Sequence, residues 1–173
     1  RSLHRRGPGP VKFTRTERRV TGPGGFGSPR LYLAGHEAFQ LPANEKAALK
    51  RYLENGGFLF AEACCGRKGF DMSFRRLVKE IFPAHGLRRM AANSQAFKYP
   101  NEVSMVGVTP TLMQDLGQAG IQPVLEGIVI DGHCAAIYSR FGMAGGWEMS
   151  QSPYARGYND VGSIKTGQNI LMY

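Results

Sequence analysis

The fold is decided by residues 30–63, whose sequence is RLYLAGHEAFQLPANEKAALKRYLENGGFLFAEA. Two short apolar runs near its ends have the continuous hydrophobic character of strands that are buried on both faces. Between them, Pro42 fits the first turn of a helix, and Asn55-Gly56-Gly57 supplies the left-handed end that helices commonly have. The β-α-β unit of a parallel sheet is therefore predicted, with a strand at 30–34, a helix at 42–54 and a strand at 57–63.

Further elements are indicated downstream. Residues 71–81 have an amphipathic helical pattern, with Asp71 as the predicted N-cap and Pro83 just after the end. The pair Asp131-Gly132 lies between two apolar runs and predicts a β-hairpin. One α/β domain over 30–173, with a mainly parallel sheet flanked by helices, is the expected fold. Its other expected parts are a strand at 103–108, a short helix after Thr109-Pro110, a Gly-rich loop at 140–163 and an apolar element from 167.

The net charge of +9 is concentrated in the first thirty residues, which hold eight of the 22 Lys and Arg but one of the 13 Asp and Glu. We interpret residues 1–29 as a basic, Gly- and Pro-rich arm. The arm leaves open an alternative function, the binding of nucleic acid or of an acidic partner. The nearly neutral remainder argues against a nucleic-acid-binding domain, because such a domain carries positive charge across a folded face.

Three cysteines are present, Cys64, Cys65 and Cys134. Neighbouring cysteines rarely bond to each other, and no C-x-x-C motif indicates a zinc ribbon or a redox site. We expect three free, partly buried thiols, with a disulfide from Cys134 to one of the pair as the alternative. No apolar stretch approaches the ~20 residues of a membrane span. The compartment, cytoplasm or bacterial envelope, and the oligomeric state stay open.

Several separated motifs together resemble one bacterial family. They are LYLAGHE at 31–37, LKRYLENGGFL at 49–59, FDMSFRR at 70–76, LEG at 125–127, IYS at 137–139, GWE at 146–148 and GQNILMY at 167–173. In this order along the chain they are similar to domain-of-unknown-function family 4159, which is placed in the class I glutamine amidotransferase-like superfamily. The resemblance covers residues 30–173.

The resemblance implies a flavodoxin-like, three-layer α/β sandwich and no assigned activity. Two departures from the family pattern stand out. Relatives carry a further strand and helix before the LYLAGHE stretch, where this chain has its basic arm, and the apolar element from 167 stops at Tyr173. We therefore expect a domain that is incomplete at both ends. Many relatives also have Asp-Gly-Arg where this chain has Asp131-Gly132-His133, so a role that depends on that arginine is not carried over.

The superfamily's enzymes place a nucleophilic cysteine on a G-x-C-x-G elbow between a strand and a helix. Residues 62–66 are Glu-Ala-Cys-Cys-Gly, so Cys64 occupies the centre of that motif, and Glu62 replaces its first glycine. The late histidine that amidotransferase chemistry needs has no clear counterpart, since His133 lies at a hairpin turn. The catalytic candidates are Cys64 or Cys65 as the nucleophile, with His36 or His85 as the base.

Polar and thiol side chains follow the two predicted parallel strands at the points where these strands end. Ligands of open α/β sheets bind outside the carboxyl ends of the strands, so we expect one shared crevice there. A His, Cys and Glu group could hold zinc, but we assign no metal and no cofactor. The competing expectation is that the adjacent cysteines point into opposite layers. The predicted crevice residues are His36, Glu37, Glu62, Cys64 and Cys65, with Asp71 at the rim.

Trp147 lies in the Gly-rich loop with Tyr154 and Tyr158. Aromatic side chains in such a loop form a recognition platform for a ligand, or they fill the end of a sheet as local core. We retain Trp147 as a ligand-binding candidate. The hypothesis that follows is a non-catalytic binding or assembly module, for a protein or a small polar ligand, with a cysteine-dependent hydrolase or transferase as the alternative.

Overall fold

The structure is a computed structural model, and it describes residues 30–173. The basic arm predicted at 1–29, and partner binding through it, lie outside the described residues. None of the helices in this part of the chain combines the length and the apolar character needed to cross a membrane.

The described residues form a five-stranded sheet with the strand order β1-β2-β7-β6-β3. β1 pairs with β2 and β2 with β7 in parallel, and the antiparallel β6 and β3 complete the sheet, so four of its five strands point the same way. The predicted parallel pairing of the first two strands is thereby confirmed. The bounds are β1 Arg30–Gly35, β2 Phe58–Ala63, β3 Arg88–Arg89, β6 Glu126–Ile130 and β7 His133–Ser139.

Helix α1, Ala43–Glu54, connects β1 to β2 and confirms the predicted β-α-β unit. Its buried face is formed by Leu49 and Leu53. The chain leaves the helix through Gly56, whose φ of +86° lies in the left-handed region that a residue with a Cβ rarely adopts.

Helix α2, Lys68–Ile81, begins three residues before the predicted start. Asp71 is therefore in the first turn of the helix, and the N-cap is Arg67, so the predicted cap is wrong. The sequence pattern missed the early start because the turn Cys64–Gly66 leads straight into the helix without a capping side chain. The early turn adds Phe70 to the buried stripe of Phe74, Leu77, Val78 and Ile81.

The predicted hairpin is confirmed, since β6 and β7 pair antiparallel across Asp131 and Gly132, both of which have positive φ. The predicted strand at 103–108 is reduced to β4, Val106–Gly107, which pairs with β5, Gly120–Ile121. The short helix after Thr109-Pro110 is confirmed as α3, Pro110–Leu116.

The segment predicted as a loop at 140–163 is partly helical. It contains α4, Ala144–Trp147, and the start of α5, Asp160–Met172, which includes the apolar element expected from 167. Gly162 and Gly167 hid this helix, because glycine lowers helix propensity. Both are needed for close packing: a Cβ at Gly162 would lie 2.9 Å from the Cβ of Val106, and one at Gly167 would lie 2.5 Å from the indole of Trp147.

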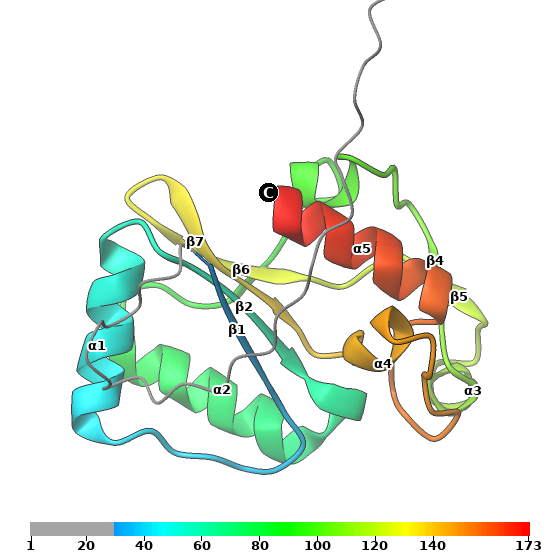
Figure 1. The fold of residues 1–173 in the computed structure, drawn as a ribbon, viewed down its shortest axis with the longest axis horizontal. Coiled ribbons are helices and arrows are strands. Elements are labelled where there is room, and N and C mark those ends of the chain that lie inside the picture. The colour runs from blue at the N-terminus through cyan, green and yellow to red at the C-terminus, as the bar shows by residue number, and fades with distance from the viewer. Residues whose placement is uncertain (1–29) are drawn as a thin grey trace, which may run out of the picture.

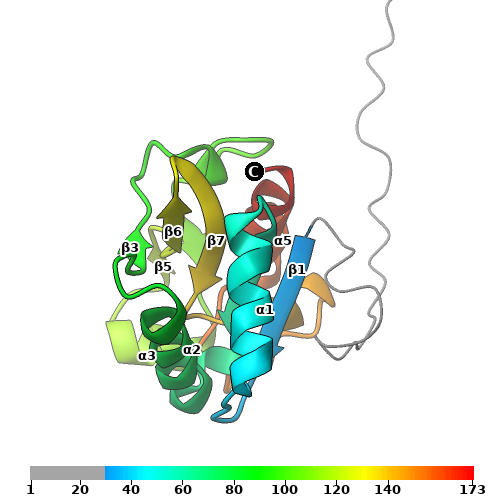
Figure 2. The same cartoon turned by 90° about the vertical axis from the view of Figure 1, so that its left-hand side faces the viewer.

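Helices cover both faces of the sheet, α1 and α2 on one side and α5 with α4 on the other (Figures 1 and 2). The alternation along β2 shows the division, since Leu59 and Ala61 belong to the core under α1 and α2, and Phe60 belongs to the core under α5. The sheet is therefore buried on both sides, as its continuous apolar strands predict.

Candidate functional site

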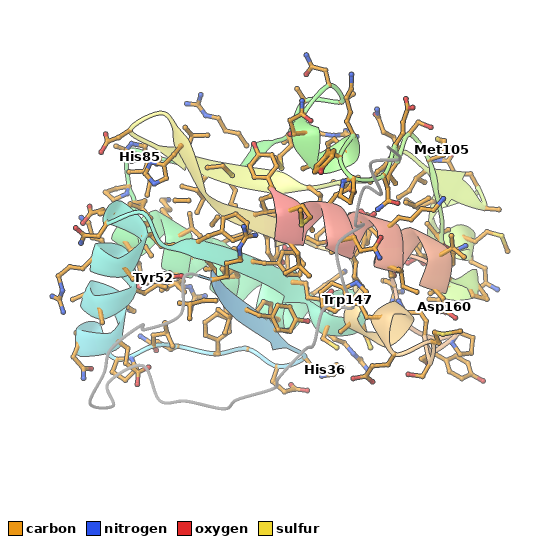
Figure 3. All side chains as sticks on the ribbon, turned by 45° about the horizontal axis from the view of Figure 1, so that its top comes forward. His36, Tyr52, His85, Met105, Trp147 and Asp160 are labelled. Atoms are coloured by element: carbon orange, nitrogen blue, oxygen red, sulfur yellow. The ribbon has the colours of Figure 1, made fainter. Side chains whose placement is uncertain are left out.

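The ends of β1 and β2 bring three of the predicted site residues, His36, Cys64 and Cys65, to one place. In the parallel register Gly35 lies opposite Ala63, so the two strands end together. His36 follows β1 directly and lies at the end of that strand in Figure 3. Cys64 and Cys65 follow β2 in the same way. A ring nitrogen of His36 and the two cysteine Sγ atoms all lie within 4.8 Å of one another.

The turn Cys64–Gly66 explains why both thiols reach the same side. Adjacent residues of a strand point to opposite faces, but Cys65 has left β2 and has the left-handed values φ 55° and ψ 18°. This conformation breaks the alternation and turns Sγ of Cys65 back toward Cys64. The elbow expected to centre on Cys64 therefore has its left-handed residues one and two positions later, at Cys65 and Gly66.

Two loop segments hold this turn in place. The backbone N–H of Arg156 donates to the carbonyl oxygen of Cys65 at 3.0 Å, and the N–H of Gly142 donates to the carbonyl of Arg156 at 3.0 Å. A Cβ at Gly142 would lie 2.7 Å from the backbone nitrogen of Cys65, a separation that real Cβ atoms do not show. Glycine at 142 is therefore what allows the loop to support the cysteine turn.

The position of His36 depends on contacts between the loop after β1 and the start of α2. A Cβ at Gly69 would lie 3.0 Å from the backbone nitrogen of Ala38, so glycine allows the loop to approach the helix. The N–H of Phe39 then donates to Oγ of Ser73 at 3.1 Å. These contacts hold the loop beside the helix that follows the cysteines. The ring of His36 is exposed and takes part in no hydrogen bond among the described residues.

The environment of Cys64 favours a protonated thiol. Burial, followed by the neighbouring Cys65 and Glu62, raises the pKa of Cys64 from its ordinary value of 9.0 to about 12. A nucleophilic cysteine needs the opposite change, because the thiolate is the reactive form. All three cysteines are free, as predicted.

Glu62 is fully buried and is engaged by other parts of the fold. Its carboxylate accepts hydrogen bonds from the hydroxyl of Tyr32, from the N–H of Met143 at 2.5 Å and from the N–H of Ala144 at 3.1 Å. Burial raises its pKa, and these three hydrogen bonds oppose that rise. Glu62 thus fixes the start of α4 to the sheet, on the face opposite α2.

Two further candidates make internal contacts, and a third faces solvent. The carboxylate of Asp71 accepts from Nε of Arg75 at 3.0 Å and from the hydroxyl of Tyr138 at 2.8 Å. Trp147 donates its indole N–H to the carbonyl of Ser163 at 2.8 Å and packs against the core under α5. Glu37 is exposed beside His36. The ligand-binding roles expected of these three residues stay predictions.

The aromatic residues of the Gly-rich loop have different environments. Tyr158 is fully buried, and its hydroxyl bonds with the backbone of Val124. Tyr154 is 86% exposed. They do not form one platform with Trp147.

The other described histidines lie away from the thiols. His85 follows the far end of α2, whose 14 residues span about 21 Å at the usual rise per residue. Figure 3 shows His85 far from His36. His133 begins β7, which is parallel to β2, so it lies at the opposite end of the sheet from Cys64. Neither histidine is placed to act as a base for the thiols.

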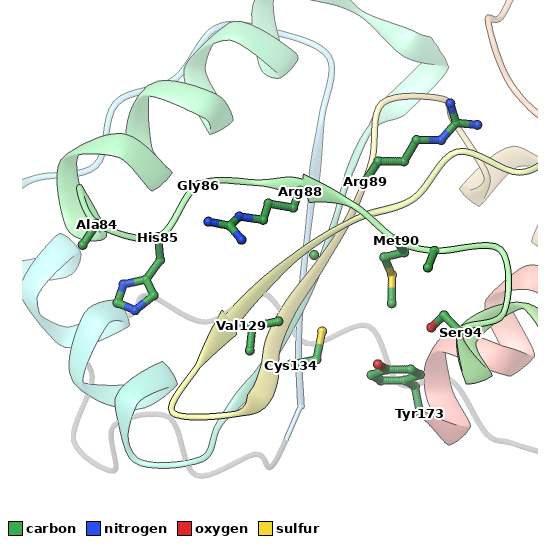
Figure 4. A pocket seen from close by; sticks show the side chains of 12 residues that line it. Ala84, His85, Gly86, Arg88, Arg89, Met90, Ser94, Val129, Cys134 and Tyr173 are labelled. Atoms are coloured by element: carbon green, nitrogen blue, oxygen red, sulfur yellow. The ribbon is translucent and has the colours of Figure 1, made fainter.

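A pocket of about 500 Å³ lies at that opposite end, beside β3 and the hairpin. In Figure 4 the side chain of Arg88 extends toward His85, whereas Arg89 points away, and Cys134 and Tyr173 line the other end. Of the predicted site residues, His85, the alternative base, lines this pocket, and none of the predicted crevice residues does.

An ionic cluster joins α2 to the sheet and was not predicted. Arg75 donates to both carboxylate oxygens of Glu126, at 3.0 and 2.6 Å, in addition to Asp71. Its guanidinium lies 5.5 Å from the ring centroid of Tyr138. Glu126 and Tyr138 follow Arg75 by 51 and 63 residues along the chain. No local sequence pattern relates residues so far apart, so the cluster could not be predicted.

These features define a mixed α/β protein with a mostly parallel sheet, helices on both faces and an imidazole–thiol cluster at the carboxyl ends of two parallel strands. The chain belongs to the family described as "Domain of unknown function (DUF4159)", whose model matches residues 15–173. The family resemblance noted in the sequence is thereby confirmed. No curated protein matches the chain.

Proposed function

We propose that the protein is a non-catalytic binding or assembly module whose site is the cluster of His36, Cys64 and Cys65. The proposal includes a flavodoxin-like, three-layer scaffold of the class I glutamine amidotransferase-like type. The observation that carries it is the position of the cluster, within 4.8 Å, at the carboxyl ends of two parallel strands. Ligands of open α/β sheets bind at this end.

The argument against catalysis rests on the missing partner of the base. A cysteine hydrolase needs a histidine next to the thiol and a third group that orients the histidine. His36 satisfies the first requirement. Among the described residues no carboxylate or amide hydrogen-bonds to its ring, and the nearby buried carboxylate of Glu62 is engaged by Tyr32 and the start of α4.

The second candidate is a cysteine-dependent hydrolase or transferase that uses Cys64 or Cys65 with His36. It is favoured by the same short separation between the imidazole and the thiols. A left-handed residue in a turn from strand to helix is also a feature of nucleophile elbows. The two functions differ in the reactivity they require of the thiols.

Alkylation of the reduced, metal-free protein with iodoacetamide at pH 7 separates the two. The binding module predicts that Cys64 and Cys65 react no faster than glutathione, with Cys134 as an internal reference, and that the protein releases no ammonia from glutamine. A rate about tenfold above that of glutathione, as a thiol with a lowered pKa would give, contradicts the module. So does any hydrolysis that Cys64→Ser abolishes.

A further inference from the structure

We propose that His36, Cys64 and Cys65 bind one Zn²⁺ ion. This inference rests on the proposed function, since it names the ligand of the same site. Two thiolates and one imidazole are donors that Zn²⁺ prefers, whereas Mg²⁺ and Ca²⁺ require oxygen ligands. The buried carboxylate of Glu62 is not counted among the zinc ligands, because it already accepts three hydrogen bonds within the fold.

The separations suit a single ion. With zinc–sulfur bonds of about 2.3 Å and zinc–nitrogen bonds of about 2.0 Å, the donors of a tetrahedral site lie roughly 3.5–3.8 Å apart. The three donor atoms of the cluster lie within 4.8 Å of one another. Small side-chain rotations bring them to bonding distance, and the exposed ring of His36 is free of hydrogen bonds to other described residues that would resist such a rotation.

The backbone at Cys65 supports the same assignment. Its φ of 55° is a conformation that glycine and asparagine adopt far more readily than other residues. A cysteine at this position places a second thiol beside Cys64, which an extended residue could not do. Hydrogen bonds and close packing with the loop at Gly142 and Arg156 also fix the backbone of this turn. The two thiols are therefore positioned beside each other in the metal-free protein.

Three protein donors leave one tetrahedral position for water or for a donor from another molecule. The two thiolates balance the charge of Zn²⁺. Because His36 is exposed and both cysteines are partly exposed, this position is open to solvent. A fourth donor from a protein partner would convert the cluster into a closed site, which is consistent with an assembly role.

Metal titration of the reduced protein, freed of metal with a chelator, tests the inference. We expect Co²⁺ and Cd²⁺ to bind with a stoichiometry of one, with thiolate-to-metal charge-transfer absorption, and Zn²⁺ to displace both. Mg²⁺ should compete with none of them. Cys64→Ser and His36→Ala should weaken Zn²⁺ binding by more than the roughly 10–100-fold that loss of an outer-shell partner costs. Cys134→Ser is the matched control and should bind Zn²⁺ as the wild type does.

Cys65→Gly provides a variant whose folding is not in question. Glycine suits the left-handed turn, so the metal-free variant should be at least as stable as the wild type, and it should lose Zn²⁺ binding. Absence of stoichiometric binding, or binding that survives Cys64→Ser and Cys65→Gly, overturns the inference. The outcomes are separable: inert thiols without metal binding leave the binding module standing, whereas rapid alkylation and a Cys64-dependent hydrolysis refute the module whatever the metal titration gives.

Discussion

Replacement of Glu62 by alanine should destabilise the protein strongly, because the carboxylate holds the start of α4. Glu62→Ala removes the acceptor of the N–H groups of Met143 and Ala144 and of the Tyr32 hydroxyl. An unpaired buried donor costs roughly 1–3 kcal/mol. Tyr32 is half exposed, so we count the two backbone donors alone, which gives an expected loss of about 2–6 kcal/mol. This is a large share of the ~5–15 kcal/mol that stabilises a typical domain.

Urea unfolding measured by fluorescence suits this prediction, because Trp147 is the single tryptophan and lies on α4. Glu62→Gln keeps the shape and one acceptor oxygen, so it should lose about half as much. Glu37→Gln, at an exposed position, is the control and should stay within ~0.5 kcal/mol of the wild type. A loss for Glu62→Ala no greater than that of the control would refute the reasoning about this carboxylate.

The pH dependence of the free energy of unfolding, compared between the wild type and Glu62→Gln, gives a second test of the role of Glu62. Burial raises the pKa of Glu62 in the folded protein above its ordinary value of 4.5. The protonated form of Glu62 is therefore favoured in the folded protein. The free energy that this pKa difference adds to stability is complete below pH 4.5 and is lost as the pH rises through the folded-state pKa. Glu62→Gln cannot ionise. The stability advantage of the wild type over this variant should thus be larger at acid pH than at pH 7, and an advantage that grows with pH would contradict the assignment.

Two further substitutions test the contacts around the site. Gly142→Ala, whose Cβ would lie 2.7 Å from a backbone nitrogen of the cysteine turn, should lower the melting temperature and weaken Zn²⁺ binding, whereas Gly86→Ala, with open space around it, should do neither. Arg75→Ala should cost about 1–2 kcal/mol in urea unfolding, because the partly buried Glu126 loses a bidentate partner. Arg76→Ala, exposed on the same helix, is its control, and equal losses for the two would exclude a stabilising role for the ionic cluster.

The sequence allowed prediction of those elements whose signals are local. The first β-α-β unit and the hairpin at Asp131-Gly132 follow from apolar runs bounded by glycine and turn residues, and both are present. Helix α5 was missed because Gly162 and Gly167 lower its propensity, although close packing against Val106 and Trp147 requires them.

The grouping of His36 with the cysteines could be predicted from strand polarity, since parallel strands end at the same edge. The side to which each cysteine points could not, because it depends on the left-handed conformation of Cys65. That conformation is set by loops near 142 and 156, far away along the chain. The internal partners of Glu62 escaped prediction for the same reason, since Met143 and Ala144 follow it by 81 and 82 residues.

X-ray absorption spectroscopy of the zinc-loaded protein tests most directly that His36, Cys64 and Cys65 form one site. We predict a first shell with two sulfur atoms at about 2.3 Å and an imidazole nitrogen at about 2.0 Å, completed by one light atom. A shell that contains only oxygen and nitrogen, or a single sulfur, would contradict the account, because the two adjacent thiols would then not share an ion.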